Sequence, residues 1–336
     1  MAGPPLPATP PDAAGSSEAL LRRLEWTVVK RLDGLLQGDW RTLRRGNGVD
    51  LADLREYQLH DDVRHIDWNV TARMGVPHVR VLHEDRDLTC WFLLDLSGSV
   101  DFGSGDVSKL ALSAGFVAAL ARVLTRHGNR IGALLYGSHV DTVLPPGTSR
   151  RHVLDLLTRM RRPRPAISAG TGTGTQPGTD LARLLTAAQA AMTRRSLVFV
   201  VSDFISAPGW EPVLTRLAQR HEVVAVRLFD PLEGELPDMG LVTVQDAETG
   251  EQLFVDSTDP AFRARYAQIA AQREQALLEA LAGCGVDTLE LATDDDLLQA
   301  LLRLCDLRRQ RARLKAPLRF PAALRRAEPA AREARA

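Results

Sequence analysis

The sequence predicts an α/β protein with a doubly wound, mostly parallel six-stranded sheet. Strand-length apolar segments alternate with helical segments from residue 88 to residue 308, an order typical of a parallel sheet with helices on both faces. The first segment, residues 88–96 (LTCWFLLDL), is almost continuously apolar, as expected of a strand covered on both faces. Two later strands, residues 131–136 and 140–144, are joined too tightly for a crossover, so the second must run antiparallel at an edge.

Three further strands complete the expected sheet, and they cover residues 197–201, 223–229 and 286–291. With the strands numbered 1 to 6 in chain order, right-handed crossovers favour the order 3-2-1-4-5-6. Apolar residues at helical spacing predict the helices between them, over residues 108–128, 150–160, 180–192, 211–220, 260–282 and 294–308. Leu241–Val244 and Gln252–Val255 flank a Gly-containing turn and predict a surface hairpin.

The segments on either side of this α/β domain (residues 87–308) differ from it in composition. Residues 1–17 are mostly Pro, Ala, Gly and Ser and are expected to be disordered. Residues 18–86 form an N-terminal extension, with a helix over 18–36 and a β-hairpin in which residues 66–70 and 79–81 are the strands. Residues 309–336 are expected to be a basic, disordered tail, since residues 308–336 hold ten basic and two acidic side chains, a net charge of 10 − 2 = +8.

Composition excludes several classes of protein. The 42 basic and 42 acidic residues cancel, and 45% of residues are hydrophobic, which is ordinary for a globular chain. The longest uncharged apolar stretch with helical character, Leu110–Ala121, is too short to span a bilayer. The N-terminus has no basic-then-apolar signal pattern, and the three cysteines form no CxxC motif. We therefore expect a cytoplasmic protein with reduced thiols.

Polar residues gather where the winding direction of the predicted sheet reverses. Asp95, Ser97 and Ser99 follow the strand 88–96, Asp203 follows the strand 197–201, and Thr179 precedes the helix that leads into that strand. Strand ends and helix starts share one sheet edge, so these segments converge on the crevice in which open α/β sheets bind ligands. All five side chains offer hard oxygen ligands, which suit Mg²⁺ or Mn²⁺. The competing interpretation is that they are ordinary turn and helix caps.

The sequence resembles a known family at this point. Asp95–Ser99 (DLSGS), Gly178–Leu181 (GTDL) and Val201–Phe204 (VSDF) look like the metal-ion-dependent adhesion site of von Willebrand factor A domains. The upstream motifs look like the signature of domain-of-unknown-function family 58, whose members are often encoded beside MoxR-type AAA+ ATPases; these motifs are Leu54–Tyr57 (LREY), Asp61–Trp68 (DDVRHIDW) and Thr71–Arg73 (TAR).

The resemblance implies roles for the five residues. Ser97, Ser99 and Thr179 would be direct metal ligands, and Asp95 and Asp203 would hold coordinated waters. The chain departs from the family pattern at Leu59-His60, where Pro-Gly is usual, and at Asn69–Thr71, where a serine before Ala-Arg is more usual; neither change touches the metal positions.

The charged segment Asp61–Arg73 has two interpretations. It could be a face on which a partner docks. It could also be a structural clasp, in which Asp67 and Arg73 belong to an Arg–carboxylate network that ties the hairpin to the main sheet, with Trp68 packed beneath. The sequence favours the clasp.

Three functions follow, and the first is favoured. The first is a non-enzymatic module that presents a metal-filled crevice to a carboxylate of a protein client and acts as an adaptor for a MoxR-type ATPase, the ATPase being implied by the family alone. The second is a Mg²⁺-dependent phosphoryl-transfer or hydrolytic enzyme. Ser97 stands where such a site would carry an acidic residue, and no lysine follows in a plausible role. The third is nucleic-acid binding through the basic tail.

Overall fold

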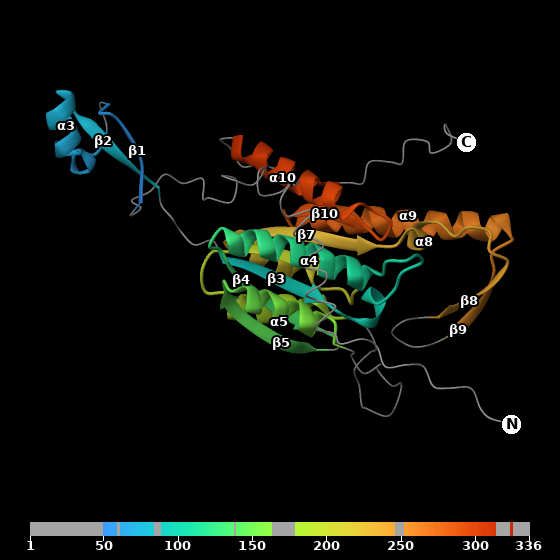
Figure 1. The fold of residues 1–336 in the computed structure, drawn as a ribbon. Coiled ribbons are helices and arrows are strands. Elements are labelled where there is room, and N and C mark those ends of the chain that lie inside the picture. The colour runs from blue at the N-terminus through green and yellow to red at the C-terminus, as the bar shows by residue number, and fades with distance from the viewer. Residues whose placement is uncertain are drawn as a thin grey trace. The chain divides into compact units, whose positions relative to one another are not determined.

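The computed structural model describes residues 50–58, 61–83, 89–137, 139–162, 179–245, 252–313 and 323–324. They belong to two compact units: residues 36–88 form one, and the described residues from Thr89 onward belong to the other (Figure 1). The expected disorder of residues 1–17 and the expected helix over residues 18–36 lie outside the described residues.

The larger unit contains a seven-stranded sheet in the order β11-β10-β7-β6-β3-β4-β5. All neighbouring strands pair in parallel except β4 and β5, which are antiparallel. The six strands expected from the sequence therefore lie in the expected order, with the antiparallel strand at an edge. Their bounds are β3 Thr89–Asp95, β4 Arg130–Tyr136, β5 Val140–Gly147, β6 Leu197–Ser202, β7 Glu222–Phe229 and β10 Asp287–Ala292.

The seventh strand corrects the expectation of a disordered tail. Helix α10 continues to Arg313, and β11 (Ala323–Leu324) pairs in parallel with Thr288 and Leu289 of β10. The edge of β10 would otherwise present unpaired backbone donors and acceptors, which a short added strand satisfies. Part of the segment 309–336 thus belongs to the fold.

Helices cover both faces of this sheet (Figure 1). Helices α5 (Arg150–Met160), α4 (Lys109–Arg126) and α10 (Leu297–Arg313) pack in sequence along one face. Helices α6 (Leu181–Ala191), α7 (Glu211–Arg220) and α9 (Pro260–Gly283) contribute to the core on the other.

Alternate side chains of the central strands enter these two cores. Trp91 and Leu93 of β3 pack with residues of α6 and α7. Phe92 stacks on Phe199 of β6 at 5.6 Å between ring centroids, and Phe116 of α4 meets Phe199 edge-on at 5.9 Å. This two-sided burial explains why β3 reads as a continuous apolar run.

The smaller unit corrects the expected hairpin over residues 66–70 and 79–81. Its two strands are β1 (Asp50–Glu56) and β2 (His78–His83), paired antiparallel, while the 3₁₀ turn η2 (Val63–His65) and helix α3 (Trp68–Met74) lie between them. Asp67 accepts hydrogen bonds from the backbone N–H groups of Asn69 and Val70, and Gly75 ends the helix at φ 70°. These two caps outweigh a short alternation of apolar residues. Ile66 alone forms the expected bridge to Val79.

Two smaller elements extend the larger unit. Strands β8 (Leu241–Gln245) and β9 (Gln252–Asp256) pair antiparallel, which confirms the expected surface hairpin. The four-residue helix α8 (Pro231–Gly234), which follows β7, was not expected. In the described part of the chain, no helix combines the length and the apolar character needed to cross a membrane.

Candidate metal site

Asp95 ends strand β3 and is fully buried. Its Oδ1 accepts a hydrogen bond from the backbone N–H of Ser97 at 3.0 Å, and its Oδ2 accepts one from the hydroxyl of Ser202 at 2.6 Å. Both carboxylate oxygens are therefore held in fixed directions by neighbouring strand ends. Sequence reasoning assigned no role to Ser202, although its position beside Asp203 at the end of β6 is the signal that could have found it.

The two serines of the DxSxS motif lie together in a tight turn. The 3₁₀ turn η3 (Gly98–Val100) follows Ser97, and the hydroxyl oxygens of Ser97 and Ser99 are 3.1 Å apart. Ser97 is buried and Ser99 is half-buried. The turn thus directs two neutral oxygen donors to one point, as a shared cation ligand set requires.

Asp203 follows β6 in a constrained turn. Its Oδ1 accepts a hydrogen bond from the backbone N–H of Ile205 at 3.0 Å, and the next residue, Phe204, has a φ of 59°. A bulky residue in this left-handed region costs roughly 1–3 kcal/mol, which surrounding contacts must offset. Ser202 accepts the N–H of Phe204 at 2.8 Å, and the Phe204 ring packs at 5.6 Å from Trp210. These contacts hold the turn that orients Asp203.

Thr179 is buried at the start of α6. Its carbonyl oxygen accepts hydrogen bonds from the N–H of Ala207 at 2.9 Å and from the hydroxyl of Ser206 at 3.0 Å. The backbone N–H of Asp180 donates a hydrogen bond to the hydroxyl of Tyr136. Tyr136 is the last residue of β4 and stands opposite Asp95 in the register of β3 and β4. The segment before α6 is therefore tied to the turn that follows Asp203 and to strand β4, the neighbour of the strand that carries Asp95.

The two carboxylates of this site are close enough for each to affect the other. Burial, followed by the negative charge of Asp203, raises the pKa of Asp95 to about 6. Two carboxylates that repel each other are relieved by a positive charge between them. Within the described residues there is no cluster of three or more His, Cys, Asp or Glu side chains suited to a metal. A metal here would therefore depend on serine and threonine hydroxyls, and the oxygen-only donor set of Ser97, Ser99 and Thr179 with two carboxylates fits Mg²⁺ or Mn²⁺.

One charged residue of the site was missed from the sequence. The Lys109 ammonium lies 2.9 Å from Oδ2 of Asp203 and 2.6 Å from Oε1 of Glu233. Burial alone would lower the pKa of Lys109, but the charges of Asp203 and Glu233 outweigh it and leave the pKa raised. The argument from the sequence against a phosphoryl-transfer site overlooked Lys109, which contacts one of the two carboxylates.

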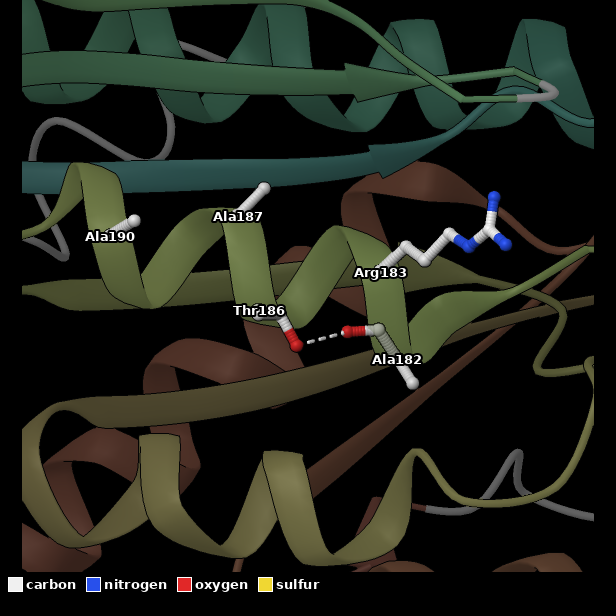
Figure 2. Close-up of a pocket in the computed structure, with 5 residues that line it drawn as sticks. All are labelled: Ala182, Arg183, Thr186, Ala187 and Ala190. Atoms are coloured by element: carbon white, nitrogen blue, oxygen red, sulfur yellow. Dashed lines mark hydrogen bonds between the residues drawn. The ribbon is translucent and has the colours of Figure 1, made fainter.

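A hollow of about 460 Å³ lies elsewhere, on α6 (Figure 2). A single helix supplies its lining, made of Ala182, Arg183, Thr186, Ala187 and Ala190. The Thr186 hydroxyl donates to the Ala182 carbonyl at 2.7 Å, and Arg183 pairs with Asp180 at 3.0 Å. This hollow is lined by small residues and one arginine from a single helix and brings together no set of carboxylates and hydroxyls, so the strand ends are the better candidate site.

The clasp expected in Asp61–Arg73 takes a different form. Asp61 pairs with Arg55 of β1 through both guanidinium Nη atoms, and it accepts the N–H of Gln58 at 2.8 Å. Within this unit Trp68 is 69% exposed and does not pack beneath the Arg55–Asp61 pair. Arg73 is also exposed. The buried member of the segment is Asp67, whose carboxylate caps α3 and so leaves Trp68 at the surface of the first turn.

We expect Trp68→Ala to change the free energy of unfolding by less than about 0.5 kcal/mol, because the ring is mostly in solvent. Asp67→Ala removes a helix cap and should cost about 1 kcal/mol. Chemical denaturation followed by circular dichroism compares the two variants. A larger loss for Trp68→Ala than for Asp67→Ala would restore the buried-clasp interpretation.

Comparisons with known proteins give a family for the chain. The family described as "Protein of unknown function DUF58" matches residues 53–276. An uncharacterized protein of Mycobacterium tuberculosis (strain ATCC 25618 / H37Rv) is 39% identical over 294 residues, which cover 88% of this chain and 90% of that protein. A protein of Paracoccus denitrificans named "Uncharacterized protein in moxR 3'region" is 34% identical over 98 residues, which cover 29% of this chain and 92% of that protein.

Two solved structures are similar to this chain in fold at low sequence identity. The conserved hypothetical protein BatB from Bacteroides thetaiotaomicron gives a TM-score of 0.41 at 13% identity and covers 66% of this chain and 99% of its own. The SpRpn10 VWA domain gives a TM-score of 0.35 at 14% identity and covers 65% of this chain and 95% of its own. Neither likeness bears on what this chain binds.

Proposed function

The chain belongs to the DUF58 family, as its motifs predicted, and we propose that it is a non-enzymatic, metal-dependent protein-binding module. It binds Mg²⁺ or Mn²⁺ in the crevice at the ends of β3 and β6. The loaded crevice binds a carboxylate of a protein client. The module acts as an adaptor for a MoxR-type AAA+ ATPase in protein assembly or maturation.

The observation that supports this proposal best is the pair of serine hydroxyls beside two carboxylates, Asp95 and Asp203, that interact electrostatically. Ser97 and Ser99 bring their oxygens within 3.1 Å of each other beside the buried carboxylate of Asp95. Direct ligands that are mostly neutral leave a divalent cation with net positive charge, and such a cation also keeps open positions for water or an added oxygen. A carboxylate from another protein is a strong ligand for that position.

The link to an ATPase is supported by one relative. The Paracoccus denitrificans protein carries the moxR 3′ region in its name. We extend that association to this chain as a proposed partnership with a MoxR-type ATPase. We also propose that the module works in the reducing cytoplasm, because its three cysteines are buried thiols rather than disulfides.

An enzyme of the phosphoryl-transfer class remains the alternative, and Lys109 is the observation that could favour it. Its ammonium, however, is fully buried and shared between two carboxylates, so it is not presented to a phosphate in solution. Asp95 is also buried, with both oxygens accepting hydrogen bonds, and is not poised as a nucleophile. Hydrolysis of generic phosphate esters that needs Mg²⁺ and is abolished by Ser97→Ala would establish the enzyme instead.

We expect Ser99→Ala to weaken the stabilisation that Mg²⁺ confers while hardly changing stability without metal. The variant removes one half-buried hydroxyl, and stabilisation by a ligand grows with its affinity for the folded state. Melting curves with and without Mg²⁺ measure both effects. Thr186→Ala, which removes an exposed hydroxyl on α6, is the matched control and should respond to Mg²⁺ like the wild type.

Capture of partners from the native cell tests the adaptor role. The tagged wild-type chain, with and without a chelator, is compared with Ser99→Ala. A client that depends on the crevice is retained by the metal-loaded wild type and lost in the other two samples. Equal metal affinity in Ser99→Ala and wild type would remove the metal site, and with it this function.

A further inference from the structure

A buried lysine connects the candidate metal site to helix α8. Lys109 is the first residue of α4, and its side chain is fully buried. Its ammonium contacts Asp203, in the turn after β6, and Glu233, in α8 after β7. The Asp203 side chain is 1% exposed, whereas the Glu233 side chain is 30% exposed. The three charges therefore form a chain that runs from the crevice to the surface.

The position of this lysine is unfavourable unless both carboxylates compensate it. A cation at the N-terminus of a helix faces the positive end of the helix dipole, and a buried charge also loses its hydration. The chain is otherwise rich in arginine, with three lysines against 42 − 3 = 39 arginines. A compact ammonium can contact two carboxylates at one point, which a planar guanidinium cannot do in the same space.

Lys109 competes with a metal for Asp203. Oδ1 of Asp203 is committed to the N–H of Ile205, and Oδ2 accepts from the ammonium. A divalent cation held through Asp203 must share this carboxylate with a charge that repels the cation. Glu233 accepts from the same ammonium through Oε1, and its other oxygen accepts the backbone N–H of Asp230 at 3.2 Å.

We propose that Lys109 and Glu233 form a charge relay that sets the metal affinity of the crevice from the surface of α8. Lys109 lowers the affinity of the site for a metal ion because its ammonium already binds the Asp203 carboxylate. Glu233 restores part of that affinity because it neutralises part of the ammonium charge. When a basic group of a partner protein pairs with Glu233, Glu233 no longer compensates the charge of Lys109. The whole ammonium charge then acts on Asp203, and the metal ion is released more easily. The relay rests on the proposed function, because it regulates the same metal site.

The test is a calorimetric titration of the full chain with Mn²⁺, and separately with Mg²⁺. Lys109→Met should bind metal at least about tenfold more tightly, because a repelling charge a few ångströms away is removed. Glu233→Gln should bind at least about tenfold more weakly, since the variant reproduces neutralisation of Glu233. Glu235→Gln removes an exposed carboxylate two residues away and should change the affinity far less.

The double variant Lys109→Met/Glu233→Gln separates a relay from a general effect of charge. Through a relay, Glu233 acts by way of the lysine, so the double variant keeps the tight binding of Lys109→Met. If the two charges act independently, the double variant returns to wild-type affinity, and the relay is refuted. Where Lys109→Met does not fold, the comparison of Glu233→Gln with Glu235→Gln decides, and equal affinities of these two refute the relay.

Failure of the relay and failure of the proposed function give different results. Metal binding by wild type with unchanged affinity in Lys109→Met removes the relay and leaves the metal-dependent module intact. Metal binding by Lys109→Met but not by wild type removes the proposed function, and the relay with it, because the lysine then takes the place of a metal ion in the wild-type chain. Absence of binding in both removes the two proposals together.

Discussion

Asp203→Ala is expected to lower the free energy of unfolding by about 3–5 kcal/mol. The change leaves the fully buried ammonium of Lys109 with one carboxylate, Glu233, in place of two. Removal of one partner of a buried ion pair typically costs this much, and here the remaining ammonium is not hydrated and keeps only one of its two carboxylate partners. It also removes the acceptor for the N–H of Ile205 beside the strained Phe204. Urea unfolding followed by circular dichroism, without added metal, measures the loss.

The double variant Asp203→Ala/Lys109→Met is the control for this prediction. Removing both charges eliminates the uncompensated cation, so the double variant should regain much of the stability that Asp203→Ala loses. This result would show that Asp203 stabilises the fold through Lys109, in addition to its expected role in binding a metal ion. If Asp203→Ala is as stable as the wild type, the buried Lys109–Asp203 ion pair is contradicted, and the Lys109 ammonium must be in contact with solvent.

Topology made the location of the site predictable. Asp95, Ser97, Ser99 and Asp203 follow strand ends, and a parallel sheet brings its strand ends to one edge whatever the side chains do. Thr179 was placed by the same argument, since helix starts lie at that edge. The apolar run of β3 and the tight connection of β4 to β5 then determined the order of the strands.

The charged network could not be predicted because it depends on distances across the fold. Lys109 and Asp203 are 94 residues apart, and Lys109 and Glu233 are 124 residues apart. No local pattern connects them, and the long lysine side chain reaches its partners only after α4 has packed on the sheet. Helix α8 has four residues, which is too few for a helical periodicity to be visible in the sequence.

Local signals for helix α3 were present in the sequence but were given too little weight. Asp67 and Gly75 lie at the two ends of α3 as N-cap and C-cap residues, and these signals are stronger evidence than three alternating apolar residues. The strand β11 carries no such signal. It is two residues long and pairs only because the edge of β10 is available, so a basic, Ala-rich sequence gave no reason to expect it.

Another buried carboxylate, Asp230, anchors the loop that connects the serine turn to α4. Ser104 of that loop donates to Asp230 through its backbone N–H at 2.8 Å and through its hydroxyl at 2.6 Å. Thr293 and the N–H of Leu232 donate to the same carboxylate at 2.7 Å and 3.0 Å. Burial alone would raise the pKa of Asp230, but these hydrogen bonds outweigh it and hold the pKa below its usual value. The loop between Ser99 and Lys109 therefore depends on the ionised carboxylate of Asp230, the N-cap residue of α8.

Asp230→Ala should lower the free energy of unfolding by about 3 kcal/mol or more at neutral pH, because four donors lose a charged acceptor in a buried place. Asp256→Ala, which removes an acceptor of two hydrogen bonds from Thr258 in an exposed turn, is the matched control and should lose far less. The pKa of Asp230 is lowered in the folded state, so its contribution is present above the ordinary carboxyl pKa and disappears as the pH falls through the folded value. The difference in stability between wild type and Asp230→Ala, measured by urea unfolding across this acidic range, should therefore shrink as the pH falls. A difference that is constant with pH would mean that packing, rather than the ionised carboxylate, holds the loop.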